Sequence, residues 1–475
     1  MTTTQSAQPG SASASSLRAA REGWPDPGTL RWSTFALGAD DIDPFTLAAG
    51  PERRGPGTVI DNGRTVLATS GVAVRLALPR GVADVDDTEA VRAWLAAVPV
   101  GSAAPGRARG VPWGPTAAGA MPFTPSEPAT LVVPELSYCR VDGRAFATVV
   151  VPAGPPLPWA VDAEGVRREL TSRLAGTPPA GDGLGSGTRE ALPTPLLRRL
   201  ELPTPSVFTD GVLRALGAIG ARELTKVVLA RRVVASFDRT PDVAELLRRL
   251  RAHEPSTVVY GVIDGAGAFV GASPELLVRR SGITVSSRPF AGTVGISGEP
   301  AADAVALAGL ANSAKEADEH RQVVDAVVAG LSPLCRELRV PAAPTVERLA
   351  TGAHLATEID GTLSESLGAL TLAGRLHPTP AVAGTPTLAA LELLGALEPD
   401  ERGRYAGPVG WMDADGDGEF VVAIRGATVH GTSAIMHVGA GIVAGSEPEL
   451  ELAETTLKLR AVLESLGVDS DLAEG

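Results

Sequence analysis

The chain has 475 residues, of which 44% are apolar, and its formal net charge at pH 7 is −13. This length predicts a large folded core, and an acidic balance without a long basic run argues against nucleic acid or an anionic membrane surface as a partner. Cys139 and Cys335 are the only cysteines, too few for a disulfide framework or a thiolate metal site. No run of about 18 apolar residues indicates a transmembrane span, and the N-terminus lacks a secretory apolar segment. We therefore expect a cytoplasmic protein.

The first part of the chain is predicted to be rich in strands. Residues 1–25 are rich in Ser, Ala and Thr and are expected to form a disordered tail, followed by a strand-rich half over 26–200. Asn62-Gly63 and Asp142-Gly143 each separate two apolar runs, which predicts two hairpins. A short helix is expected at 162–175.

The Gly/Pro-rich composition of residues 177–195 predicts a linker or loop. Its glycines do not match G-x-G-x-x-G and no strand precedes them, so a dinucleotide site is not expected.

The second part alternates helices with strands. Helices are expected at 209–224 and 242–253, and a long helical region at about 301–331. Strands are expected at 225–237, in four short runs between 258 and 287, and again from 407. This pattern predicts a layered α/β or α+β architecture.

The stretch His437–Gly467 predicts a strand, a glycine turn and a long helix. Ser446 and Glu449 have the spacing of a capping box, and Gly467 is a stop signal. Glu454 and Lys458 are four residues apart and therefore share a helix face. The pair could hold a cation and an anionic substrate, or it could be an ordinary exposed ion pair.

Two ionisable residues stand beside apolar strands. Lys226 opens KVVLARRVV, and its alternate face carries Val228 and Ala230. A desolvated lysine there could act as a general base, and the alternative is a lysine that reaches water from a strand end. Glu275, in GASPELLVRR, could be held protonated and act as an acid, or could lie on a solvated strand edge.

Glu319 continues the apolar stripe of Val323 and Val327 on the predicted helix, whereas Glu316 and Asp318 are expected to be solvated. A single inward carboxylate suits Mg²⁺, which takes one or two protein carboxylates together with substrate oxygens and water. The alternative is that Glu319 is a boundary residue at the end of the apolar stripe.

Two further patterns suggest metals and are interpreted otherwise. DADGDGEF resembles the start of a calcium loop, but its twelfth position is Ile424 where a glutamate is needed, so we interpret it as a hairpin turn. His354 and His377 lack a second ligand at helical spacing and are expected in pocket loops.

The second part also carries a series of longer motifs. They are KVVLARR, GASPELLVRR, RPFAGT, Glu319-His320, HLAT, LHPTPAVAGTP, YAGPVGW, VVAIRGA, GAGIV and the final E-x-x-x-K, in this order over 205–468. They resemble those of the chorismate-utilising enzymes, which include isochorismate, salicylate, anthranilate and aminodeoxychorismate synthases. GAMPF at 119–123 also looks like isochorismate synthases.

The resemblance implies a fold: a chorismate-binding-enzyme fold of α+β type, with large antiparallel sheets flanked by helices, in a single large domain with two sub-halves. The catalytic region would be 205–468. The resemblance also implies roles for individual residues: Lys226 would be the general base, Glu275 the general acid, and Glu319 and Glu454 the ligands of Mg²⁺. The substrate chorismate would be bound by Gly292, Thr293, His354, Ala381, Tyr405, Arg425, Gly439 and Lys458.

Three functions remain open: two reactions and a binding role without catalysis. Ala291 stands where aminodeoxychorismate synthases carry a lysine nucleophile, and the HPTPA form, with Ala381, looks like isochorismate synthase. The resemblance therefore favours an isochorismate synthase, a monomer without a glutaminase subunit. A salicylate or anthranilate type lyase is the alternative, and a catalytically silent chorismate-binding protein is a third possibility.

Overall fold

The computed structural model describes residues 23–37, 42–50, 55–101, 112, 114–155, 157–174, 195–265, 267–350, 352–469 and 472. Except for residues 23–25 and 195, the predicted tail and linker lie outside these residues.

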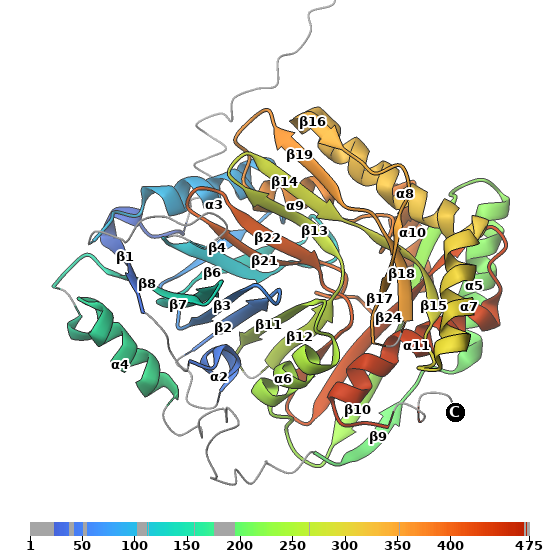
Figure 1. The fold of residues 1–475 in the computed structure, drawn as a ribbon, viewed down its shortest axis with the longest axis horizontal. Helices are drawn as coiled ribbons and strands as arrows, with labels where there is room; N and C mark the ends of the chain where they lie inside the picture. The colour runs from blue at the N-terminus through green and yellow to red at the C-terminus, as the bar shows by residue number, and fades with distance from the viewer. Residues whose placement is uncertain are drawn as a thin grey trace, which may run out of the picture.

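Two large antiparallel sheets form the body of the molecule (Figure 1). The 12-stranded sheet contains, in spatial order, β1 (Leu30–Ala36), β8 (Arg144–Pro152), β7 (Leu136–Val141), β3 (Thr65–Ser70), β2 (Gly57–Asp61), β11 (Val258–Asp264), β12 (Gly267–Ser273), β23 (Gly426–His430), β24 (Ser433–Val443), β10 (Lys226–Phe237) and β20 (Gly384–Thr385), with β9 (Leu197–Glu201) also paired to β10.

The 9-stranded sheet has the order β16 (Cys335–Arg339), β19 (Ile359–Leu363), β14 (Thr284–Arg288), β13 (Leu276–Ser281), β22 (Gly418–Val422), β21 (Pro408–Asp413), β5 (Thr116–Ala120), β6 (Ala129–Val133) and β4 (Val74–Leu78). A third, 3-stranded sheet consists of β15 (Phe290–Gly295), β18 (Gly352–Ala356) and β17 (Thr345–Arg348).

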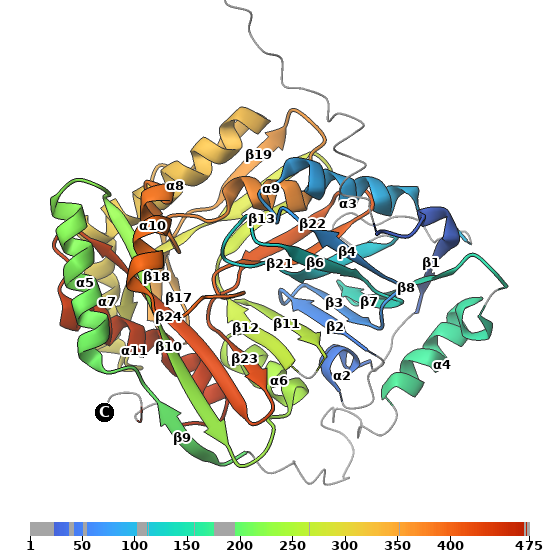
Figure 2. The same ribbon diagram turned by 180° about the vertical axis from the view of Figure 1, so that it is seen from behind.

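Helices flank the three sheets, with α7 (Pro300–Asn312) against the 3-stranded one (Figures 1 and 2). They are α2 (Pro44–Ala49), α3 (Val85–Ala97), α4 (Ala163–Leu174), α5 (Pro205–Gly220), α6 (Val243–His253), α7 (Pro300–Asn312), α8 (Ala314–Leu331), α9 (Ala369–Leu376), α10 (Thr387–Leu397) and α11 (Pro448–Ser465), with short 3₁₀ turns at Pro27–Thr29, Pro158–Ala160 and Ser332–Leu334. Among the described residues, none of these helices combines the length and apolar character of a membrane span.

The apolar core lies in layers. One buried cluster joins the facing sides of the two large sheets and includes Ile60, Tyr260, Phe269 and Trp411. Larger clusters lie between each sheet and its helices. The predicted α+β architecture of antiparallel sheets flanked by helices is confirmed, and strands from both halves of the chain share each large sheet, as in β2 beside β11 and β5 beside β21.

Local sequence signals account for several element boundaries. The Asn62-Gly63 and Asp142-Gly143 hairpins are confirmed, as turns between β2 and β3 and between β7 and β8. Asp242 caps α6, since its side chain accepts a hydrogen bond from the backbone N–H of Glu245 at 3.1 Å. The DADGDGEF segment is a hairpin turn, because the Asp413 carboxylate accepts the N–H groups of Asp415 and Asp417.

The predicted helical region 301–331 is confirmed and consists of two helices, because the Ser313 hydroxyl accepts the backbone N–H of Glu316 and starts α8. One predicted helix feature was wrong. The capping box at the start of α11 does not form. Glu447 is its N-cap and makes no side-chain cap bond, while the Ser446 hydroxyl accepts the N–H of Val443 and so closes the turn after β24.

Candidate active site

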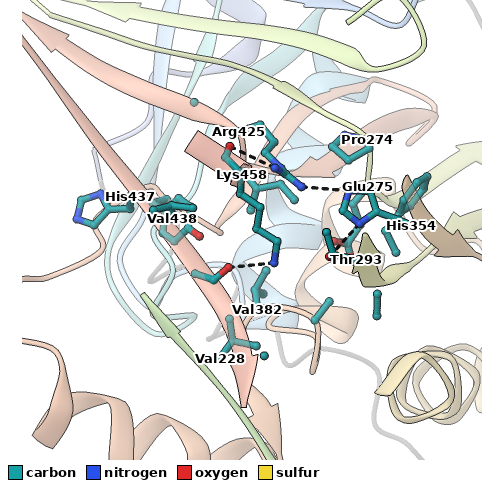
Figure 3. Close-up of a pocket in the computed structure, with 18 of the residues that line it drawn as sticks. Val228, Pro274, Glu275, Thr293, His354, Val382, Arg425, His437, Val438 and Lys458 are labelled. Carbon is teal, nitrogen blue, oxygen red and sulfur yellow. Dashed lines mark hydrogen bonds between the residues drawn. The ribbon is translucent and has the colours of Figure 1, made fainter. Parts of the chain in front are cut away.

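A pocket lies where β10, β24, β15 and β18 meet α8 and α11, and Figure 3 shows many of its side chains. All but two of the predicted site residues line it: Glu275, Gly292, Thr293, Glu319, His354, Ala381, Tyr405, Arg425, Gly439 and Lys458. The two exceptions are Lys226, which is hydrogen-bonded to the pocket residue Glu319, and Glu454, which forms an ion pair with the pocket residue Lys458. Residues separated by more than 180 positions in the chain therefore meet in one cavity.

Lys226 is completely buried, so the alternative in which it reaches water is wrong. Its ammonium group donates a hydrogen bond to Glu319 Oε1 at 2.9 Å. Burial tends to raise the pKa of Glu319, but the charges of Lys226 and other lysines outweigh it and leave that pKa below its ordinary value. Gly441 in β24 leaves room for this pair, because a Cβ there would lie 2.5 Å from Glu319 Oε1.

Glu275 is a second buried glutamate of the pocket, and its pKa is raised, whereas that of Glu319 is lowered. It is 3% exposed, and burial raises its pKa to about 8, although the charges of Lys226 and Lys458 act in the other direction. The turn that carries it is fixed by Ser273, whose hydroxyl accepts the Glu275 N–H and donates to the carbonyl of Val422. Glu275 is therefore protonated at neutral pH and can donate a proton into the pocket.

Arg425 and His354 form a connected wall of the pocket (Figure 3). Arg425 donates to the backbone carbonyl of Lys458 at 3.2 Å and its Nη2 lies 3.1 Å from His354 Nε2. Desolvation, together with the nearby cations, keeps the pKa of His354 well below its ordinary value, so the ring is neutral at pH 7. His354 Nδ1 lies 3.1 Å from both the carbonyl oxygen of Gly292 and the hydroxyl of Thr293.

Lys458 supplies a second cation at the pocket. Its ammonium group donates to the carbonyl of Gly439 at 3.0 Å and lies 2.5 Å from Glu454 Oε1, so the predicted shared face of α11 is confirmed. Tyr405 lines the same side and its ring stacks against His437 at a centroid distance of 5.4 Å.

Two acidic residues near the site were missed by the sequence reasoning. Glu316, expected to be solvated, is mostly buried and accepts the backbone N–H of Thr293 at 3.1 Å, whereas Asp318 is exposed as predicted. Glu451 is buried and pairs with Lys315 at 3.2 Å. Each precedes a predicted metal ligand by three residues, and this i, i+3 spacing was the available signal.

A cluster of four carboxylates that repel one another lies on α8 and α11 and consists of Glu316, Glu319, Glu451 and Glu454. Desolvation raises the pKa of Glu316, and the charges of Glu319 and Glu454 raise it further. Desolvation likewise raises the pKa of Glu451, with Glu454 adding to the effect. Such mutual repulsion suits a cation, although the described residues contain no group of three or more His, Cys, Asp or Glu side chains in metal-binding geometry. A set of one or two carboxylates completed by substrate and water fits Mg²⁺.

The two histidines expected in pocket loops behave differently. His354 does line the pocket but lies in β18, not in a loop. His377 ends α9, and its Nε2 lies 2.8 Å from the carbonyl oxygen of Phe123, outside this pocket.

Comparisons with known proteins identify the family of the chain. A family model described as chorismate binding enzyme matches residues 109–467. Isochorismate synthase DhbC of Bacillus subtilis (strain 168) is 42% identical over 276 residues, which cover 56% of this chain and 69% of that protein. Isochorismate synthase EntC of Escherichia coli (strain K12) is 33% identical over 357 residues, covering 74% of this chain and 82% of that protein.

A solved structure shares the fold over nearly the whole chain. MenF, the menaquinone-specific isochorismate synthase from Escherichia coli, is 24% identical, with a TM-score of 0.75 and coverage of 95% of this chain and 99% of that chain. Since the family model spans most of the sequence, the chain belongs to the chorismate-binding enzyme family.

Proposed function

We propose that this protein is an isochorismate synthase, an isomerase that interconverts chorismate and isochorismate. Relatives named as isochorismate synthases at 33% and 42% identity support this reaction. The structural observation that carries the proposal is Glu275, a buried carboxylic acid with a pKa of about 8 beside a pocket lined by cations. Loss of a ring hydroxyl needs such a proton donor.

The cations suit a substrate with two carboxylates. Arg425 can bind one carboxylate through its planar guanidinium group, and Lys458 can bind the other as a point charge. The backbone at Gly292, Thr293 and Gly439 would complete the cradle. Tyr405 and neutral His354 would then contact the ring.

Lys226 and Glu275 would carry out the proton transfers. In its neutral form, Lys226 would accept a proton from the water that attacks C2 of the ring, while Glu275 would protonate the departing C4 hydroxyl. One water is consumed and one is released, so the reaction is an isomerisation.

We also propose a requirement for Mg²⁺, held by Glu319 and Glu454. The ion would neutralise and orient the ring carboxylate. Glu316 and Glu451, one helical turn earlier, would add negative charge around it. We expect EDTA to abolish turnover and Mg²⁺ to restore it, and calorimetric titration of the metal-free protein with Mg²⁺ should show binding that Glu319→Gln weakens.

Product analysis tests the reaction itself. The protein is incubated with chorismate and Mg²⁺, with and without ammonia, and the products are separated by chromatography. Isochorismate in both samples is the expected result. Salicylate with pyruvate, or anthranilate formed only with ammonia, would instead establish a lyase. Ala291, which lines the pocket, offers no amine nucleophile for the aminodeoxychorismate reaction.

A further inference from the structure

The edge of β10 is incompletely paired beside the pocket. One edge of this strand pairs with β24 from Lys226 to Ser236. The other edge pairs with β20 only at Lys226 and Val227, and with β9 only from Val234 onward. The backbone between these points needs other hydrogen-bond partners, because it lies in the core.

Arg402 and Glu398 supply partners along this gap. Arg402 Nη2 donates to the carbonyl of Val228 at 2.6 Å, and Glu398 Oε1 accepts the N–H of Ala230 at 2.8 Å. The two side chains also bind each other through two hydrogen bonds, at 2.5 and 2.8 Å. This ion pair therefore takes the place of a missing strand for two residues of β10.

The same guanidinium group holds a second wall of the pocket. Arg402 Nη1 donates to the carbonyl of Val382 at 2.7 Å, and both Val228 and Val382 line the pocket. Ala381, next to Val382, is a predicted substrate contact. The carbonyl of Arg402 accepts the N–H of Tyr405 at 3.0 Å, which ties the Tyr405 turn to the same point.

We propose that Arg402, with Glu398, is a positioning residue that sets the distance between the Val228 and Ala381–Val382 walls. This inference rests on the proposed function, since both walls would contact the bound ring. Arg402 is 6% exposed and does not line the pocket, so it would act only through the segments it binds.

Arg173 provides a matched control far from the site. It is 2% exposed, forms an ion pair with Glu169 four residues earlier at 2.9 Å, and donates to the carbonyl of Ser70 at 3.1 Å. Its guanidinium carbon also lies 5.6 Å from the ring centroid of Trp159, as that of Arg402 lies 4.3 Å from Phe123. The two arginines thus share burial, an ion pair, a carbonyl contact and an aromatic neighbour, but only Arg402 contacts pocket walls.

The test compares Arg402→Met with Arg173→Met in steady-state kinetics with chorismate and Mg²⁺, with rates expressed per folded molecule from circular dichroism. We expect kcat/KM of Arg402→Met to fall by about 100-fold, the scale of a 1 Å displacement, mainly through a higher KM. Arg173→Met should lower thermal stability and keep the wild-type constants. Equal kinetic constants in the two variants would overturn the positioning role.

Two further variants cover a failure to fold. Arg402→Lys keeps a charge beside Glu398 but cannot reach both carbonyls, so it should show a smaller increase in KM, and a wild-type KM would refute the inference. Arg402→Ala leaves room for a guanidinium ion, and millimolar guanidinium should lower its KM while leaving Arg173→Ala unaffected. If the wild-type protein makes no isochorismate, the proposed function fails instead, and chorismate binding by the same variants then tests the positioning role.

Discussion

At the residue scale, burial has opposite outcomes for two glutamates of one pocket. Among the residues that the structure describes, no cation is hydrogen-bonded to the Glu275 carboxylate, so desolvation dominates and its pKa is about 8. Glu319 has Lys226 at 2.9 Å, and its pKa stays below the ordinary value despite burial. One pocket can therefore hold a proton donor and an anionic ligand at the same pH.

Glu275→Gln should abolish turnover, because the amide keeps the shape of the side chain but cannot supply the proton. For the wild-type enzyme, kcat/KM should fall as pH rises above about 8, where Glu275 of the free enzyme ionises. Rates measured from pH 6 to 10, with the variant's folding checked by circular dichroism, test both statements. A variant with near wild-type turnover, or a wild-type kcat/KM that rises across pH 8, would remove Glu275 from its role as the acid.

Glu275 should also make stability depend on pH. Its folded pKa, about 8, is above the ordinary value of 4.5, so its contribution is fully present below pH 4.5 and is lost as pH rises through 8. A pKa difference of this size corresponds to on the order of 5 kcal/mol. We expect Glu275→Gln to flatten the decline of unfolding free energy between pH 5 and about 9, as measured by urea denaturation. Parallel curves for the two proteins would contradict this.

At the element scale, β24 forms part of the pocket wall, and α11, the element that follows it, carries Glu454 and Lys458. The turn between them is closed by Ser446 and not by a capping box, so α11 starts at Pro448. Gly441 lies in β24 where Glu319 of α8 crosses the strand. The geometry of the Lys226–Glu319 pair therefore depends on a missing side chain in a third element.

Gly441→Ala should disrupt this arrangement. Its Cβ would lie 2.5 Å from Glu319 Oε1 and 3.1 Å from Lys226 Cε, so the carboxylate must move. We expect a loss of about 100-fold in kcat/KM and weaker Mg²⁺ binding by calorimetric titration. Gly395→Ala in α10 is the control, because its Cβ would meet no atom within 4 Å and alanine favours a helix. Full activity in Gly441→Ala would show that Glu319 needs no fixed position.

At the scale of the whole molecule, the two halves of the chain form one structural unit. β2 is hydrogen-bonded to β11 in the larger sheet, and β5 to β21 in the other. The division of the chain into the ranges 26–200 and 205–468 stays a prediction. Neither large sheet is complete without strands from both ranges.

We therefore expect a single cooperative unfolding transition for the full chain in calorimetry. A fragment comprising 205–468 should lack a cooperative transition, because it would expose the edges of β11 and β21 and the apolar faces beside them. Two separate transitions in the full chain, or a fragment that melts cooperatively and binds chorismate, would show that the halves fold independently.

Local sequence signals predict much of the secondary structure, and the motifs predict the set of residues around the pocket. Asn-Gly and Asp-Gly turns, the Asp242 cap and the four-residue spacing of Glu454 and Lys458 are local features, encoded by neighbouring residues. The motifs that resemble a known family pointed to Glu275, His354 and Arg425, and these do line one cavity.

The burial of these residues and their contacts depend on the packing of the whole fold. The sequence pattern is compatible with a Lys226 side chain that reaches water and with one that is buried and acts as a base. It predicts a solvated Glu316. The fold instead buries Lys226 against Glu319 and brings Glu316 to the backbone of Thr293. The sequence likewise does not predict which backbone carbonyls Arg402 binds, because they belong to β10 and to the loop that contains Val382. Desolvation and ion pairing depend on atoms supplied by segments far apart in the chain, and local spacing carries no information about those atoms.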